Sequence, residues 1–209
     1  MSYRKFQTLI GHPAPGIVCR RAGDGHARDR YTARVRHEVG GPAYSRAVMQ
    51  LTKRLIPLGA EQLAAFYARH DGFTLYRDVH SDAAGVRLFA LGEIEEQTAS
   101  YRRWLRGGVD EASDPLPYLS AVAIGEVPRS ANYFIMTTTG PNTGKVFLKA
   151  HDDWDEGPFA TSFDAFLARI CTRPAQLLTD TLGGFARYVD DRTDIDWYPV
   201  RYVRDATKA

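Results

Sequence analysis

Cysteine is scarce in this chain of 209 residues, which contains only Cys19 and Cys171. Two isolated cysteines cannot form the disulfide framework of a small secreted domain, and their separation matches no zinc-binding spacing. Either thiol could in principle act as a nucleophile, but each lies among apolar neighbours. We interpret both as small buried side chains in a reducing compartment.

Long hydrophobic runs are also missing. The purely apolar stretches span only a few residues, as at 121–124, whereas a membrane helix needs about 20. The N-terminal residues include charge but no sustained apolar segment of the secretory type. A composition of 44% hydrophobic and 25% charged residues is ordinary for a globular protein with one sizeable core. We therefore predict a cytoplasmic protein without membrane contact.

The motifs of common enzyme classes are absent from the sequence. There is no His pair at the i, i+4 spacing of a zinc helix, no GxSxG elbow and no complete phosphate-binding glycine loop. His26, His70 and His80 each have an aspartate nearby, but their contexts are a hairpin turn, a helix end and a polar loop. We therefore predict no catalytic residues, no metal and no cofactor, and interpret the protein as not an enzyme.

Lysine is rare, because 22 of the 27 basic residues are arginine. Charge is also uneven: residues 1–50 contain nine Lys/Arg against three Asp/Glu, and residues 108–170 contain four against nine. An early arginine-rich segment could face phosphates, although its alternation with Tyr31 and Val35 is typical of a half-solvated strand. With a net charge of only +2, we predict no direct nucleic-acid partner. The arginines of this segment are Arg20, Arg21, Arg28, Arg30, Arg34 and Arg36.

Periodicity and turn residues predict the first half of the fold. Alternating apolar residues on either side of a polar turn indicate a hairpin over 17–39. Helical spacing predicts helices that end at Pro57 and near His70, and Asp71-Gly72 supplies a left-handed stop after the second. Strands over 74–77 and 86–91 and a helix from Ile94 to Leu105 follow.

The second half is predicted in the same way. A short apolar strand at 121–126 precedes a hairpin whose strands, 133–138 and 145–150, flank a turn rich in Gly, Pro and Asn. A hydroxyl of Thr161 or Ser162 can cap a helix in which Phe163 and Phe166 begin a core-facing stripe. A short helix from Pro174 leads to a terminal hairpin, 185–189 with 197–203, in which Pro199 indicates an edge or a bulge. These elements predict one α+β domain over 1–209.

The densest polar cluster is the segment 151–156, HDDWDE. Its carboxylates could hold a hard cation, but it lacks the alternating ligands and hinge glycine of an EF-hand. It could be a solvated connection whose tryptophan folds back on the core, or it could grip a basic protein. Our candidate partner-binding residues are Asp152, Asp153, Trp154, Asp155 and Glu156.

Several segments taken in order resemble the SUKH superfamily of yeast cell-wall-assembly regulators (Smi/Knr type) and their bacterial relatives. They are the helix ending in AspGly at 57–73, LeuPheAlaLeuGlyGluIle at 88–94, the AlaIleGlyGlu strand, the YFIM and KVFL hairpin, and SerPheAspAlaPheLeu at 162–167. The likeness covers residues 45–170. The segment 88–94 lacks the family's proline, and the hairpin regions 1–44 and 171–209 lie outside the common core as N- and C-terminal extensions.

This resemblance implies a single mixed, largely antiparallel sheet wrapped by helices, with extra terminal hairpins. In bacteria it implies frequent use as an immunity protein that binds and neutralises a delivered toxin, often a nuclease. If the toxin is a nuclease, acidic residues of the segment 152–156 could occupy its basic substrate groove. The alternatives are a regulatory scaffold or adaptor that binds a host protein, and a metal-assisted hydrolase using His151.

Overall fold

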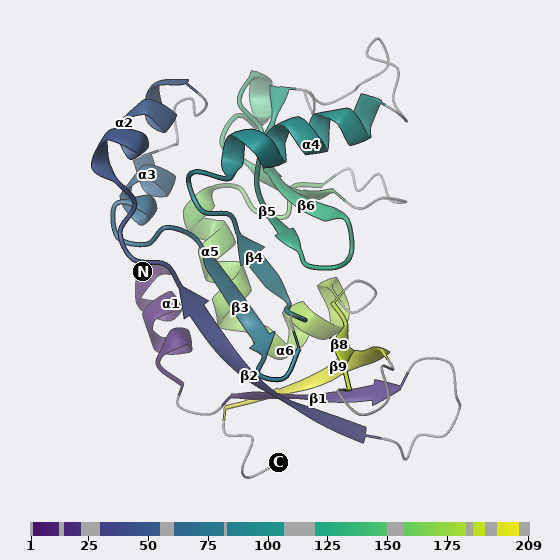
Figure 1. Cartoon of the computed structure of the whole chain (residues 1–209). Helices are drawn as coiled ribbons and strands as arrows, with labels where there is room; N and C mark the ends of the chain where they lie inside the picture. The colour runs from purple at the N-terminus through teal and green to yellow at the C-terminus, as the bar shows by residue number, and fades with distance from the viewer. Residues whose placement is uncertain are drawn as a thin grey trace.

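The computed structural model describes residues 2–12, 15–21, 30–54, 61–81, 83–106, 120–149, 157–182, 186–190 and 196–204. They form an α+β protein built on one open sheet with strand order β7-β6-β5-β4-β3-β2-β1-β9-β8 (Figure 1). Every pairing among the described strands is antiparallel. The predicted fold class is therefore confirmed. The strands are β1 (Gly16–Arg21), β2 (Arg30–Val39), β3 (Phe73–Asp78), β4 (Val86–Leu88), β5 (Val122–Val127), β6 (Asn132–Met136), β7 (Val146–Lys149), β8 (Tyr188–Val189) and β9 (Asp196–Val203).

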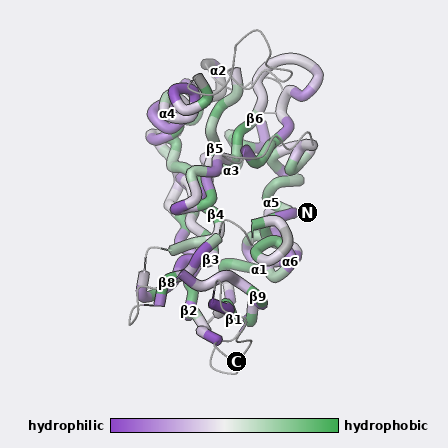
Figure 2. The backbone as a smooth tube through the Cα atoms, turned by 90° about the vertical axis from the view of Figure 1, so that its right-hand side faces the viewer, coloured by the Kyte–Doolittle hydropathy of each residue, from purple (hydrophilic) through white to green (hydrophobic). Residues whose placement is uncertain are grey.

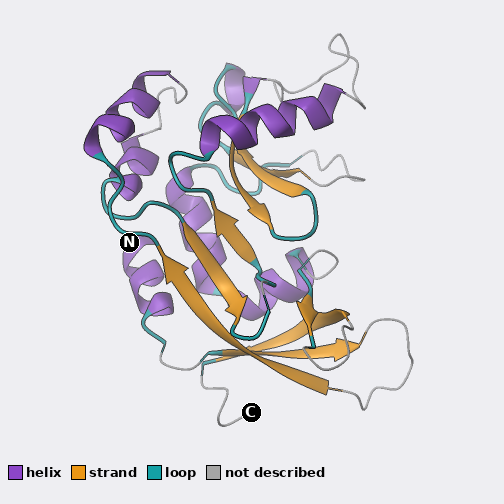
Figure 3. Cartoon of the chain, viewed as in Figure 1, coloured by secondary structure: helices purple, strands orange, loops and turns teal. Residues whose placement is uncertain are grey.

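Helices lie on both sides of the sheet. Figure 2 shows α4 on one side and α1, α5 and α6 on the other, and the secondary-structure colouring shows the strands between them as one twisted layer (Figure 3). A 3₁₀ turn (Gly140–Asn142) and a π-helical turn (Leu177–Thr181) complete the described elements. The helices are α1 (Ser2–Ile10), α2 (Ser45–Arg54), α3 (Glu61–Tyr67), α4 (Ile94–Arg106), α5 (Phe163–Thr172) and α6 (Pro174–Gln176). None of these helices is long and apolar enough to cross a membrane.

The core beneath α1 and α5 is largely aromatic. The Ser162 hydroxyl accepts a hydrogen bond from the Ala165 amide at 3.1 Å and so caps α5; of the two hydroxyls predicted for this cap, the structure shows that of Ser162. The helix then directs Phe163 and Phe166 into a continuous ring cluster whose neighbouring centroids lie 5.1–5.9 Å apart, a normal range for edge-to-face and tilted pairs. The other members of this cluster are Phe6, Phe66, Phe73, Phe134 and Phe159.

The terminal extensions are part of the sheet. Residues 30–34 of β2 pair with β1 along one edge of the strand, and residues 35–39 pair with β3 along the other edge. The long strand β2 therefore joins the N-terminal hairpin to the central strands. The C-terminal hairpin joins through β9, which pairs with β1. Both predicted hairpins are confirmed. The amphipathic helix α1, whose Phe6 and Leu9 are buried, was not predicted.

Two local features set the backbone around β3 and β4. Gly72 has φ of 78°, as its predicted left-handed stop requires, and a Cβ there would lie 2.7 Å from the Leu88 carbonyl oxygen. Strand β4 is shorter than the predicted 86–91, because the chain turns at residues 89–93 to enter α4. Tyr76 also has positive φ, 60°, where the β2–β3 register shifts.

Candidate recognition surface

The acidic residues predicted from the sequence as partner contacts lie outside the described part of the structure, as does His151. The chain is described up to Lys149 and again from Gly157. The placement of the partner site on this segment stays a prediction. The five residues concerned are Asp152, Asp153, Trp154, Asp155 and Glu156.

The two cysteines are buried, as predicted. Burial raises the pKa of the Cys19 thiol far above its ordinary value and raises that of Cys171 to about 12. Both thiols are therefore protonated at neutral pH and behave as small apolar side chains.

Three of the described histidines have structural partners. His70 Nε2 lies 2.7 Å from the Tyr3 hydroxyl, and His12 Nδ1 lies 2.8 Å from the Tyr202 hydroxyl. His37 Nδ1 accepts a hydrogen bond from the Tyr76 amide at 3.1 Å. Because the accepting nitrogen is unprotonated, the neutral ring of His37 has its proton on Nε2.

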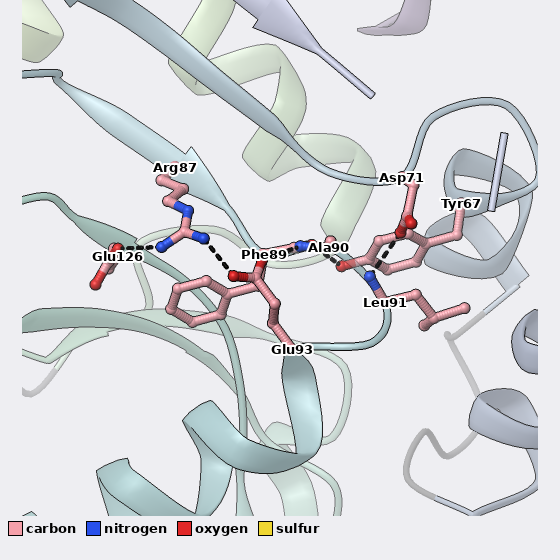
Figure 4. A network of polar contacts seen from close by, with 8 residues as sticks. All are labelled: Tyr67, Asp71, Arg87, Phe89, Ala90, Leu91, Glu93 and Glu126. Carbon is pink, nitrogen blue, oxygen red and sulfur yellow. Dashed lines mark hydrogen bonds and ion pairs between the residues drawn. The ribbon is translucent and has the colours of Figure 1, made fainter. Parts of the chain in front are cut away.

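The segment 88–94 is held by a polar network (Figure 4). The Asp71 carboxylate accepts from the Leu91 amide at 2.6 Å, and the Tyr67 hydroxyl donates to the Phe89 carbonyl at 2.8 Å. Glu93 accepts from the Ala90 amide at 2.8 Å and from the guanidinium of Arg87. Arg87 also contacts Glu126 at 3.0 Å.

This network joins three of the segments on which the family resemblance rests: the end of the helix before Asp71-Gly72, the stretch 88–94, and the strand containing Glu126. Each contact either satisfies a backbone group or pairs two charges. In this chain these contacts fix the turn between β4 and α4. They assign no chemistry to these residues.

A hollow of about 200 Å³ lies where α5 meets α6. This is below the roughly 300–1,000 Å³ typical of small-molecule sites. It is lined by Arg169, Thr172, Arg173, Gln176, Leu177 and Thr181.

The most distinctive surface in the described structure is one face of the sheet over β9, β1, β2 and β3. Directly paired residues of an antiparallel sheet project from the same face. The registers place Arg20 opposite Arg30, Gly16 opposite Arg34, and Arg36 opposite Arg77. Alternation along β2 gathers arginines on this face, while Ala33 and Val35 are buried on the opposite face. We call this surface the arginine face and define it as Arg20, Arg30, Arg34, Arg36, Arg77 and Arg201.

A bulge brings the last member to the face. Val18 pairs with Arg201, but the next residue, Cys19, pairs with Pro199, so Val200 is the extra residue of β9. The bulge puts Arg201 on the same side of the sheet as Tyr198, which pairs with Arg20. Of the two alternatives predicted for Pro199, the structure shows the bulge.

The arginine face is open within the described structure. Helix α1 packs against β2, and α6 and the π-helical turn pack against β9; all three lie against the opposite face, where Ile17 and Ala33 are buried (Figure 2). Helix α4 is on the same side as the arginine face but packs over β5 (Figure 1). The arginines of the face are therefore accessible within the described structure, on strands that are paired in one sheet.

Counterions are unevenly distributed on the arginine face. Glu38 binds both Arg36, with 2.7 Å between Nε and Oε1, and Arg77, with 2.6 Å between a guanidinium nitrogen and Oε2. The remaining four arginines are exposed and make no ion pair with any residue that the structure describes. They are Arg20, Arg30, Arg34 and Arg201.

Sequence reasoning found part of this surface. Alternation along β2 identified Arg30, Arg34 and Arg36 as a solvated strand face, and the structure confirms that interpretation. The contributions of Arg77 and Arg201 were missed, because they depend on strand neighbours more than 35 residues away. No signal within a single segment could have indicated them.

No protein-family model matches the chain, and no curated protein matches it. The resemblance to the SUKH superfamily stays a prediction.

Proposed function

We propose that this protein is a non-enzymatic bacterial immunity protein that binds and neutralises a toxin of a contact-dependent or polymorphic toxin system. The observation that supports binding is the arginine face, an exposed surface of paired strands with four arginines that have no counterion among the described residues. Arginine and tyrosine are enriched at protein interfaces, and lysine is depleted. The family resemblance supplies the class of partner.

The proposed mechanism is stoichiometric occlusion in the cytoplasm. Concentrated charge on one face accelerates encounter with a complementary surface. Strands that are already ordered lose little conformational freedom on binding, which favours affinity. A nuclease toxin with a basic substrate groove would instead suit the acidic segment 152–156, so the nuclease part of the proposal depends on that segment.

The test is co-expression with the toxic C-terminal domain encoded next to this gene. Cell survival and co-purification as a 1:1 complex measure neutralisation and binding. We expect the double variant Arg34→Glu, Arg201→Glu to lose protection and to bind at least tenfold more weakly, since each reversal replaces a complementary charge by a repulsive one. The matched control is Arg173→Glu, an exposed charge reversal at the start of α6.

Toxicity that persists in the presence of the wild-type protein, with no complex on purification, would reject the immunity role. If a complex forms with a host protein and gives no protection, the adaptor role replaces it. Equal loss of binding in the control and the double variant would show that the arginine face is not the docking surface.

A further inference from the structure

The arginine face contains two pairs of directly opposed arginines. Arg36 lies opposite Arg77 and Arg20 lies opposite Arg30 in the strand registers. Like charges directly across a sheet are destabilising, because the paired side chains start about 5 Å apart at Cβ. An anion bound between the two arginines of a pair would therefore reduce their repulsion.

In the first pair, Arg36 and Arg77, a carboxylate of the protein itself offsets the repulsion. One carboxylate, that of Glu38, lies between the two guanidinium groups and gives one oxygen to each. The contacts are 2.7 and 2.6 Å, the short distances of charge-assisted hydrogen bonds. Arg87, on the same side of the sheet, has the inverse arrangement, in which one guanidinium contacts two carboxylates, those of Glu93 and Glu126.

The second pair has no such carboxylate among the residues that the structure describes. Neither Arg20 nor Arg30 has an ion pair with a described residue, and both side chains are exposed. Arg34 lies two side chains further along the same face, about 14 Å from Arg30 at the rise of an antiparallel strand. Arg34 also makes no ion pair with a residue in the described part of the chain.

Resting on the protein-binding role proposed above, we infer that Arg20 and Arg30 form a carboxylate-binding subsite and that the docking surface of the partner is acidic protein. An Asp or Glu of the partner takes, between these two arginines, the position that Glu38 takes between Arg36 and Arg77. Tyr198, paired with Arg20 on the side away from Arg30, forms the edge of the subsite. Arg34 and Arg201 attract neighbouring carboxylates.

Charge and residue type favour protein over nucleic acid as the partner. The sequence pI is about 8.5 and the net charge is +2, whereas nucleic-acid-binding domains commonly have a pI above about 9. The face also includes Glu38, which would repel a phosphate backbone running along β2. A planar guanidinium pair around one carboxylate is the arrangement that the molecule itself displays.

The experiment uses the full chain and two labelled probes matched in the number of anionic groups: a peptide of ten glutamates and a single-stranded oligothymidylate of eleven nucleotides, which has ten phosphodiesters. Fluorescence anisotropy measures affinity at low salt and again at 0.5 M salt. We expect the peptide to bind more tightly than the oligonucleotide and to be released by salt. Arg20→Ser and Arg30→Ser should each weaken peptide binding about tenfold to a hundredfold, from the roughly 1.5–3 kcal/mol of a charged hydrogen bond.

Urea unfolding of the same variants separates binding from folding. Because the opposed charges repel, Arg30→Ser should leave the unfolding midpoint unchanged or raise it. Arg30→Lys keeps the charge but loses the planar fork and should bind the peptide with intermediate affinity. The control Arg173→Glu should match wild type in peptide affinity.

Tighter binding of the oligonucleotide would overturn the inference in favour of a nucleic-acid partner. Serine variants that bind the peptide as well as wild type would overturn the subsite. A concentration-dependent dimer that Arg30→Ser abolishes would assign the face to a second copy of this chain instead. A toxin that binds the serine variants unchanged leaves the proposed function standing and rejects the inference. Binding of the peptide at this subsite without binding of the toxin supports the inference and rejects the proposed function.

Discussion

Replacement of His37 should change how the stability of this protein depends on pH. His37 lies opposite the irregular part of β3, and its Nδ1 accepts the Tyr76 amide hydrogen. Burial, together with the nearby charge of His12, lowers the pKa of His37 from 6.5 to about 4. Protonation of Nδ1 would also break this hydrogen bond, because an N–H group would then face the Tyr76 amide N–H.

The magnitude follows from the difference between the folded and unfolded pKa values. Between pH 6.5 and 4 the unfolded chain binds a proton at His37 and the folded protein does not, so stability falls as the pH falls through this window. A difference of about 2.5 units at 1.36 kcal/mol per unit gives about 3 kcal/mol. The pKa of His12 is lowered in the same direction, by burial and by Arg204, and adds to the trend.

The informative variant is His37→Asn, because an Asn side-chain oxygen can replace Nδ1 as the acceptor for the Tyr76 amide and does not titrate. Urea unfolding of wild type and variant at pH 7 and pH 4 measures both free energies. We expect the wild type to lose about 3 kcal/mol more than the variant. Protonation of carboxylates affects both proteins and cancels in the difference.

His80→Asn is the control, because the His80 side chain is exposed. It should retain the wild-type pH dependence. An equal loss of stability between pH 7 and pH 4 in wild type and His37→Asn would refute the buried neutral state of His37.

Two further predictions concern the turn around β4. Gly72→Ala should destabilise the protein by at least about 2 kcal/mol in urea unfolding, because residue 72 has φ of 78° and the new Cβ meets the Leu88 carbonyl oxygen at 2.7 Å. A loss below 0.5 kcal/mol would contradict this reasoning. Glu93→Ala should cost about 1–2 kcal/mol and Glu93→Gln less, because glutamine retains an acceptor for the Ala90 amide and loses only the charge facing Arg87. Equal losses in the two variants would show that the ion pair, not the amide contact, dominates.

Local sequence patterns predicted the elements whose determinants are short-range. The stripe beginning at Phe163 and Phe166 and a capping hydroxyl at Thr161 or Ser162 predicted α5, because both signals lie at one helix. The early end of β4 was not predicted, since it is imposed by contacts from Tyr67 and Asp71, residues about 20 positions earlier. Likewise, α1 has a short amphipathic pattern whose meaning depends on the aromatic cluster that Phe6 joins.

The candidate site illustrates the same limit more strongly. A sequence shows that Arg20 and Arg30 are both basic, but only the register shows that they are opposed. Arg36 and Arg77 are also opposed, but Glu38 forms an ion pair with both of them. This difference between the two arginine pairs can be recognised only in the folded sheet. The predicted acidic segment, by comparison, was conspicuous in composition and has no described geometry on which a site could be built.

The arginine face lies mainly in the parts of the chain outside the segment 45–170 that resembles the SUKH superfamily. Five of its six arginines come from the extensions 1–44 and 171–209, and Arg77 alone comes from the resembling segment. That segment contributes the turn network and the aromatic core, which are explained by folding alone. We therefore expect partner choice to reside in β1, β2 and β9. A protein that shares the core without these hairpins should bind a different partner, because it would have no opposed arginine pair to receive a carboxylate.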